Sequence, residues 1–345
     1  MVAQIRLLRS PKEPTLFAIG VVLSAIAWIA LAVTIVGLLY GGLILVVFLM
    51  AHALFLAHVK GNGVRVSERQ LPDLYMRVKA AAEKLGMTEV PAVYVLQSGG
   101  LLNAFATKLL SRKFVIIYSS LVDGCQDPRQ LDFIIGHELG HLAAGHLQWN
   151  AFLAPYRLVP LLGPAYSRAR EYTCDRCGLT VAGDLDQSAR GLVVLAAGGK
   201  QAASVDLAAF EEQRLESGFF WMSVLELVSS HPYLCKRAAA IREFVHPGTV
   251  RPVARNVFAY PLAPFFGVAA GPAAGAGAAM VVVLIVGIMA ATAIGGVRKL
   301  TEQAKAAQGP AWQSEPGDFE GTQAPVWQGG RDPTAPVQRR LRQRP

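Results

Sequence analysis

The longest stretch without a charged residue constrains this chain most. No Asp, Glu, Lys or Arg occurs between Glu13 and Lys60. In a helix, this stretch is long enough for two bilayer crossings, each of which needs about 20 apolar residues. We predict a membrane hairpin with a first span at about 16–36, a turn at about 37–42, where glycines suit a reversal, and a second span at about 41–59.

The composition agrees with a membrane protein. Of 345 residues, 53% are hydrophobic and 17% are charged, which is too apolar for a soluble enzyme of this length. Arg6, Arg9 and Lys12 precede the apolar stretch, as in a cleaved signal peptide. The stretch is longer than a signal peptide and lacks a small-residue cleavage site. We therefore predict that residues 1–60 form a short cytoplasmic segment and an uncleaved transmembrane hairpin.

A second charge-free stretch covers residues 256–297. Its second half, 279–297, predicts one further span. Prolines and glycines interrupt the first half, which fits another crossing, a re-entrant piece or a surface segment. We predict a C-terminal transmembrane region at 256–298, followed at 299–345 by a disordered basic tail rich in Pro, Gly and Gln.

Basic residues flank both ends of the N-terminal hairpin. Because cytoplasmic segments are enriched in Lys and Arg, this pattern predicts a multi-pass protein of a bacterial-type cell membrane, with the middle of the chain in the cytoplasm. Four cysteines in a chain this long predict no disulfide framework. The net charge of +9 comes with no interleaving of aromatic and basic residues, so we predict membrane lipid, and no nucleic acid, as a partner. The sequence predicts no oligomeric state.

The middle of the chain, 61–255, has the charge density of one folded domain. Pro72 opens a helical pattern that ends at Gly86. From Pro128 onward, apolar residues recur every three or four positions, which predicts a buried helix. β-prone pieces predict a small sheet, and they lie at 92–96, 103–107 and 114–121.

The buried helix carries the motif H-E-x-x-H. His137 and His141 are four residues apart and share one helix face, so both imidazoles can reach one ion. This pattern predicts one Zn²⁺ per chain, with Glu138 as the general base that acts on water. The alternative is a solvated helix face. Apolar positions around the motif bury the helix, and buried unpaired polar groups would cost a few kcal/mol.

The H-E-x-x-H motif does not specify the third metal ligand. In the metzincin pattern a third histidine follows the second by six residues, but His146 follows His141 by five and Leu147 occupies the required place. We assign His146 to packing beside the site or to solvent. A glutamate from a later helix is the alternative: Glu171 can bind the metal while Asp175, one turn on, accepts a hydrogen bond from a ligand histidine.

Cys174 and Cys177 form a C-x-x-C pair, a pattern that binds zinc or exchanges disulfides. No second such pair and no following histidine pair completes a structural zinc site. We favour packing as the role of both thiols, with Cys174 in place of Glu171 as the alternative ligand.

Four pieces of the sequence together resemble peptidase family M48, a family of zinc metallopeptidases that includes the bacterial heat-shock protease HtpX and the CAAX-prenyl protease. The pieces occur in family order and cover most of residues 60–245. They are N-A-F-A at Asn103 to Ala106, H-E-x-x-H at His137 to His141, the segment Ser167 to Asp175, and H-P-x-x-x-x-R at His231, Pro232 and Arg237.

The resemblance implies a zincin-like α+β domain, mainly helical with a small β-sheet, that hydrolyses peptide bonds of a protein or peptide substrate. His231 would donate a hydrogen bond to the oxyanion. The implied metal ligands are His137, His141 and Glu171, with Asp175 supporting a ligand histidine and Glu138 as general base. An added substrate strand would pair with the edge strand formed by Asn103, Ala104, Phe105 and Ala106.

The chain departs from the resemblance in one respect. HtpX-type members carry transmembrane spans between H-E-x-x-H and the glutamate, whereas 29 residues separate His141 from Glu171 here and Arg157 interrupts their apolar part. This departure weakens the inference of an HtpX-like cellular role in membrane-protein quality control. It does not affect the predicted chemistry. The competing hypothesis is a non-catalytic metal-binding membrane scaffold or adaptor.

Overall fold

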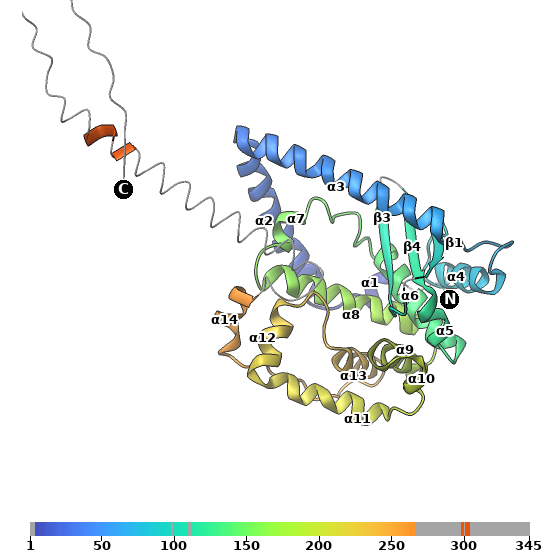
Figure 1. The fold of residues 1–345 in the computed structure, drawn as a ribbon. Helices are drawn as coiled ribbons and strands as arrows, with labels where there is room; N and C mark the ends of the chain where they lie inside the picture. Colours follow the sequence, from blue (N-terminus) through green and yellow to red (C-terminus); the bar gives the residue numbers. More distant parts are fainter. Residues whose placement is uncertain (1–3, 98, 110–111, 267–297, 300, 304–345) are drawn as a thin grey trace, which may run out of the picture. The chain divides into compact units, whose positions relative to one another are not determined.

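The computed structural model describes residues 4–97, 99–109, 112–266, 298–299 and 301–303, and the fold is mainly helical with one small sheet (Figure 1). The chain divides into two units, 1–285 and 286–345, and all elements below belong to the first. They are α1 Ile5–Leu8, α2 Glu13–Ala32, α3 Ile35–Asn62, β1 Val64–Arg65, α4 Pro72–Lys84, β2 Ala92–Leu96, β3 Ala104–Leu109, β4 Arg112–Tyr118, α5 Ser119–Gly124, α6 Pro128–Ala143, α7 Ala154–Arg157, α8 Leu162–Ala182, α9 Leu185–Ala197, α10 Gly199–Ala202, α11 Leu207–Glu212, the 3₁₀-helix η1 Gln213–Gly218, α12 Phe220–Val228, α13 Leu234–Val245 and α14 Ala259–Phe266.

The sheet has the strand order β1-β2-β4-β3. β2 pairs with β4 in parallel, while β3 and β4 are antiparallel. Three of its strands lie where the sequence predicts them. The last predicted piece, 114–121, is too long, because β4 ends at Tyr118 and Ser119 begins the short helix α5. β1 has only two residues, too few to show the alternation by which strands are predicted.

Alternate residues of the sheet face two different layers. Val93, Val115 and Ile117 join the main core with the helices of the domain. The opposite face packs against the C-terminal half of α3, where Leu56 and Val59 are 2% and 0% exposed. In Figure 1, α3 crosses this face of the sheet. The second predicted membrane helix therefore also serves as a cover for the sheet.

The main core is organised by close packing of α6 against α8. A Cβ atom added at Gly136 would lie 2.7 Å from the Cβ of Val181, and one at Gly140 would lie 2.8 Å from the Cβ of Cys177. These glycines let the two helix backbones approach until side chains on both can reach a common point. At the start of α6, Asp127 caps the helix by accepting a hydrogen bond from the amide of Arg129.

Two helices at the N-terminus are long and apolar enough to cross a membrane, by length and composition, within the residues described: Glu13–Ala32 and Leu39–Asn62. This agrees with two predicted spans. The predicted turn at 37–42 is wrong, because α2 ends at Ala32 and α3 begins at Ile35. In a strongly apolar helix the backbone groups gain most by bonding within the helix, so glycines are tolerated there and need not mark a reversal.

The base of α2 rests on the domain. A Cβ at Gly20 would lie 2.5 Å from the ring of Tyr156, which is fully buried. The indole nitrogen of Trp28 donates a hydrogen bond to the Phe152 carbonyl at 2.7 Å. The first predicted span is thus attached to the loop region around α7 along part of its length.

The C-terminal predictions lie mostly outside the described residues. The span predicted at 279–297 and nearly all of the tail at 299–345 are among them. The first half of the second charge-free stretch contains α14, whose Ala259 and Ala263 pack against α12. The domain boundaries at residues 60, 255 and 298 stay predictions.

Candidate metal centre

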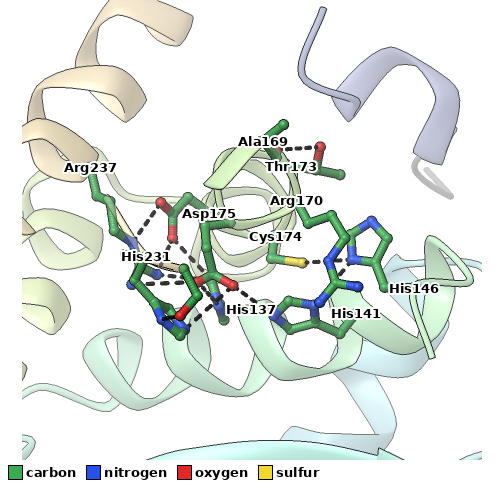
Figure 2. A network of polar contacts seen from close by, with 12 residues as sticks. His137, His141, His146, Ala169, Arg170, Thr173, Cys174, Asp175, His231 and Arg237 are labelled. Carbon is green, nitrogen blue, oxygen red and sulfur yellow. Dashed lines mark hydrogen bonds and ion pairs between the residues drawn. The ribbon is translucent and has the colours of Figure 1, made fainter. Parts of the chain in front are cut away.

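α6 places both motif histidines on one face, opposite α8. The rings of His137 and His141 have centroids 5.2 Å apart. Glu171 on α8 faces them: its Oε2 lies 3.3 Å from His137 Nε2, and its Oε1 lies 3.5 Å from His141 Nε2. One ligand atom from each of the three residues falls within 4.8 Å of the others. Figure 2 shows the two histidines beneath α8.

The donor set suits zinc. Two imidazole nitrogens and one carboxylate oxygen leave a fourth position for water in the usual tetrahedral catalytic site. Glu171 is 4% exposed, and within the described part of the chain its Oε2 has ion-pair contacts with His137 and Arg237 but no hydrogen bond of good geometry. A buried carboxylate oxygen is costly unless it is paired. An ion between Glu171 and the two imidazoles would satisfy it.

The three groups carry different charges when no ion is bound. Burial lowers the pKa of His137, but the carboxylates of Asp175 and Glu171 outweigh this and raise it to about 9. Burial lowers the pKa of His141 well below its usual value. Burial would raise the pKa of Glu171, yet the two neighbouring imidazoles hold it well below its usual range. At neutral pH the carboxylates therefore retain a proton on His137, which a metal ion must displace.

Asp175 orients the first histidine. Its Oδ1 lies 2.9 Å from His137 Nδ1, so an Nδ1–H donated to Asp175 leaves Nε2 free to bind a metal. Arg237 on α13 donates to both carboxylate oxygens of Asp175, from Nη2 at 2.6 Å and from Nε at 2.9 Å. Its Nη1 is also 3.7 Å from Glu171 Oε2. In the sequence, Arg237 is recognisable only as part of the H-P-x-x-x-x-R motif, whose spacing does not indicate this ion pair.

Glu138 lies at the wall of a small cavity beside the ligands. It is 7% exposed, and burial raises the pKa of its carboxyl group even though His137 and the amide of Ala106, which donates a hydrogen bond to it, act in the opposite direction. A carboxyl group with a raised pKa is suited to accept and return a proton near neutral pH. The cavity has a volume of about 100 Å³, and its lining includes Asn103, Ala104, His137, Glu138, Glu171, His231 and Arg237.

His231 reaches this cavity from a loop. Its side chain is 63% exposed, and its Nε2 lies 3.6 Å from Glu171 Oε1. The loop is held by Arg168 of α8, which donates hydrogen bonds to three backbone carbonyls at the end of α12. These bonds go to Glu226 at 2.6 Å, Leu227 at 3.1 Å and Ser229 at 2.7 Å.

Only some residues of the predicted edge strand, Asn103 to Ala106, face the metal centre. β3 pairs only with β4 among the described strands, so its other edge is unpaired. Asn103 and Ala104 line the cavity, and Ala106 bonds to Glu138. Phe105 points to the opposite face of the sheet, where it packs against Phe55 with ring centroids 5.8 Å apart.

The remaining candidate residues lie behind the metal centre. His146 is 3% exposed and contacts His141, in agreement with packing beside the site. Cys174 and Cys177 are free and fully buried at the contact of α6 and α8. Cys174 falls in a second group of possible ligand atoms, with His141 and His146, that does not include Glu171.

Comparisons with known proteins define the class of this centre. The family model described as Peptidase family M48 matches residues 68–161 and 149–245, which include all the candidate ligands. A chloroplast protein of Arabidopsis thaliana, plastoglobule-localized metallopeptidase 48, is 30% identical over 220 residues, or 56% of this chain and 63% of that protein. The chain thus spans less than two thirds of this relative's length. No solved structure matches the chain.

The H-E-x-x-H helix and its facing glutamate are therefore those of a metallopeptidase family. The chain belongs to peptidase family M48, as its four sequence pieces predict.

Proposed function

We propose that this chain is a membrane-anchored, zinc-dependent endopeptidase. The observation that carries the proposal is the convergence of ligand atoms from His137, His141 and Glu171 to within 4.8 Å of one another, with Glu138 in the wall of the adjoining cavity. Family membership supports a metallopeptidase. The ligands, the general base and the membrane anchor are our assignments.

His137, His141 and Glu171 would hold one zinc ion per chain. When bound, the ion supplies Lewis acidity, lowering the pKa of water and polarising the scissile carbonyl. Glu138 takes the proton from the attacking water and passes it to the leaving amine, which its raised pKa favours. His231, on its exposed loop, donates a hydrogen bond to the oxyanion as it forms.

The substrate is a protein or peptide bound as an added strand. The unpaired edge of β3 offers backbone donors and acceptors beside the cavity. Of the predicted segment, Asn103, Ala104 and Ala106 lie on the side of the metal centre, whereas Phe105 anchors the strand to α3. We assign backbone pairing to the whole segment and side-chain contact with substrate to Asn103.

We also propose the membrane arrangement. α2 and α3 cross a bacterial-type cell membrane within residues 1–60, a further span follows the zincin-like domain of 61–255, and the domain lies on the cytoplasmic side. The support is the apolar character of both helices and the basic residues that flank them. Membrane-protein quality control is the role this location favours.

The test compares wild-type protein and Glu138→Gln, both purified in detergent and loaded with zinc. The variant should keep one zinc per chain and lose about 10²- to 10⁴-fold in casein cleavage, because it lacks the proton acceptor. Glu89→Gln, an exposed glutamate, is the matched control and should cleave as wild type does. Equal cleavage by Glu138→Gln would contradict the proposal. Zinc binding with no cleavage by any of the proteins would favour the non-catalytic scaffold.

A further inference from the structure

The segment that precedes α2 is attached to the back of the metal centre. Arg9 Nη2 donates a hydrogen bond to the carbonyl of Ala144, just after α6, at 2.8 Å. The amide of Ser10 donates to Thr173 Oγ1 on α8 at 2.9 Å, and Arg176 Nη1 donates to the carbonyl of Arg9 at 2.9 Å. Residues of the predicted cytoplasmic segment thus contact both helices that carry the candidate ligands.

A buried carboxylate follows this segment at the start of α2. Glu13, the first residue of α2, is 0% exposed and forms an ion pair with Arg9. It also accepts a hydrogen bond from the hydroxyl of Thr173. Its Oε1 lies 3.2 Å from Nε2 of His146, whose side chain is 1% exposed. Burying a carboxylate destabilises the fold unless ion pairs and hydrogen bonds compensate for the lost hydration. Among the partners of Glu13, His146 lies nearest the metal centre.

His146 in turn contacts a candidate ligand. Its Nδ1 lies 3.1 Å from Nδ1 of His141, whose Nε2 faces Glu171. One proton arrangement satisfies the contacts of these rings with each other and with Glu13 while both rings stay neutral. If Nε2 of His141 binds the metal, its Nδ1–H donates to Nδ1 of His146, and the Nε2–H of His146 donates to Glu13.

We propose that His146 and Glu13 are positioning residues of the zinc site, holding the tautomer and orientation of His141 through a relay that starts in the membrane-anchoring helix. The inference rests on the proposed zinc site. It gives the two ligand histidines different supports: His137 bonds directly to the carboxylate of Asp175, whereas His141 reaches a carboxylate through a second imidazole.

A second metal ion is the other chemistry that these atoms could serve. Cys174 Sγ lies 3.6 Å from His146 Nδ1, and His141, His146 and Cys174 bring ligand atoms within 4.8 Å of one another. Such an ion would need a lone pair on Nδ1 of His141. A neutral imidazole has one lone pair, and the first ion uses it at Nε2. The relay requires no second ion and accounts for Glu13, which a site at Cys174 would not.

The test measures zinc affinity by competition with a chelator, using the full-length protein in detergent. Glu13→Gln and His146→Phe should each bind zinc about 10- to 100-fold more weakly than wild type, as is usual when a supporting residue of a ligand is removed. Because Glu13 acts through His146, the double variant should lose no more than His146→Phe alone. His146→Asn keeps an acceptor for His141 and should fall between wild type and His146→Phe. The Co²⁺-substituted variants should show a shifted ligand-field spectrum.

Glu211→Gln is the matched control, since Glu211 is also a buried carboxylate paired with an arginine, Arg242, but does not touch the metal centre. Unaltered zinc affinity in both relay variants, or losses that add fully in the double variant, would overturn the relay. If Glu13→Gln does not fold, the order of zinc affinities among wild type, His146→Asn and His146→Phe decides alone. Failure of wild type itself to bind zinc would instead reject the proposed function.

Discussion

α8 and α3 invert the usual relation between polarity and burial. α8 buries charged groups: Arg168, Glu171 and Asp175 are 5%, 4% and 1% exposed. α3 exposes apolar side chains, each between 52% and 69% exposed: Leu43, Ile44, Val46, Val47, Phe48, Met50 and Leu54 lie on its surface.

The difference teaches that each helix matches its own surroundings. These buried charges on α8 have protein partners: Arg168 donates to backbone carbonyls, Asp175 pairs with Arg237, and Glu171 faces the two motif histidines. Within the described residues, these apolar side chains of α3 are exposed, and lipid is the surrounding that would suit them. Where α3 does meet protein, at Leu56 and Val59, its side chains are buried.

A charge at the middle of α3 should have the largest effect. Val47→Lys, at an exposed apolar position, should disfavour membrane insertion by about 2.5–3.5 kcal/mol if lipid surrounds the helix. Ala57→Lys, near the end of the helix beside Lys60, is the control and should insert as wild type does. The measurement is the fraction that resists extraction from membranes at alkaline pH. If both variants resist alkaline extraction equally, lipid does not surround the middle of α3 and its contrast with α8 is lost.

A methyl group at the contact of α6 and α8 should be nearly as costly. Gly140→Ala places a Cβ 2.8 Å from that of Cys177 and should reduce the free energy of unfolding by about 1–3 kcal/mol. Gly42→Ala on α3 meets nothing within 4 Å and should be neutral or stabilising by up to about 1 kcal/mol. Denaturant unfolding in detergent measures both. Similar losses in the two variants would mean that α3 is packed as tightly as α8.

Neutralising the carboxylate behind His137 tests the buried charges of α8. Asp175→Asn keeps an acceptor for His137 Nδ1–H but removes the charge that pairs with Arg237. We expect zinc affinity to fall about 10- to 100-fold, measured by chelator competition. Asp186→Asn, at the start of α9, serves as control. If Asp175→Asn binds zinc as tightly as wild type, the charge has no part in holding the metal.

The smallest expected effect is a pH dependence near α12. Glu226 is 1% exposed; burial would raise its pKa, but Arg255 and Lys236 hold it below its usual value. Its folded pKa is therefore below the unfolded one, so its contribution to stability is present above about pH 4.3 and is lost as the pH falls through the folded pKa. In that window, Glu226→Gln should show a shallower loss of unfolding free energy, by at most ~1.4 kcal/mol per pH unit. Parallel pH profiles for both proteins would refute the assignment.

Local patterns predicted much of the fold. The spacing of His137 and His141 on an amphipathic helix, and that of Glu171 and Asp175 one turn apart, depend on helical geometry that the sequence shows directly. The three main strands were recognisable from runs of β-prone residues. The turn at 37–42 was wrong because glycine is a weak signal of a reversal inside an apolar helix.

Long-range contacts could not be predicted in this way. Glu13 and His146 are separated by 133 positions, and neither lies in a pattern that points to the other. Arg168 lies in the segment Ser167 to Asp175 that resembles the family, but its bonds to the end of α12 depend on how that helix packs. The signal in the sequence was an acidic residue at the start of an apolar span, because a charge at that place needs a partner when it is buried.

The contacts of α2 and α3 with the domain determine what is lost when the chain is truncated or its parts are exchanged. A cut after residue 60 would take away Glu13 from behind His141 and, in the same step, Leu56 and Val59 from the outer face of the sheet. The shortened chain would keep every candidate ligand and yet lack two of its internal surfaces. α2, α3 and the domain are thus one structural unit, and a replacement for either helix would have to restore these contacts.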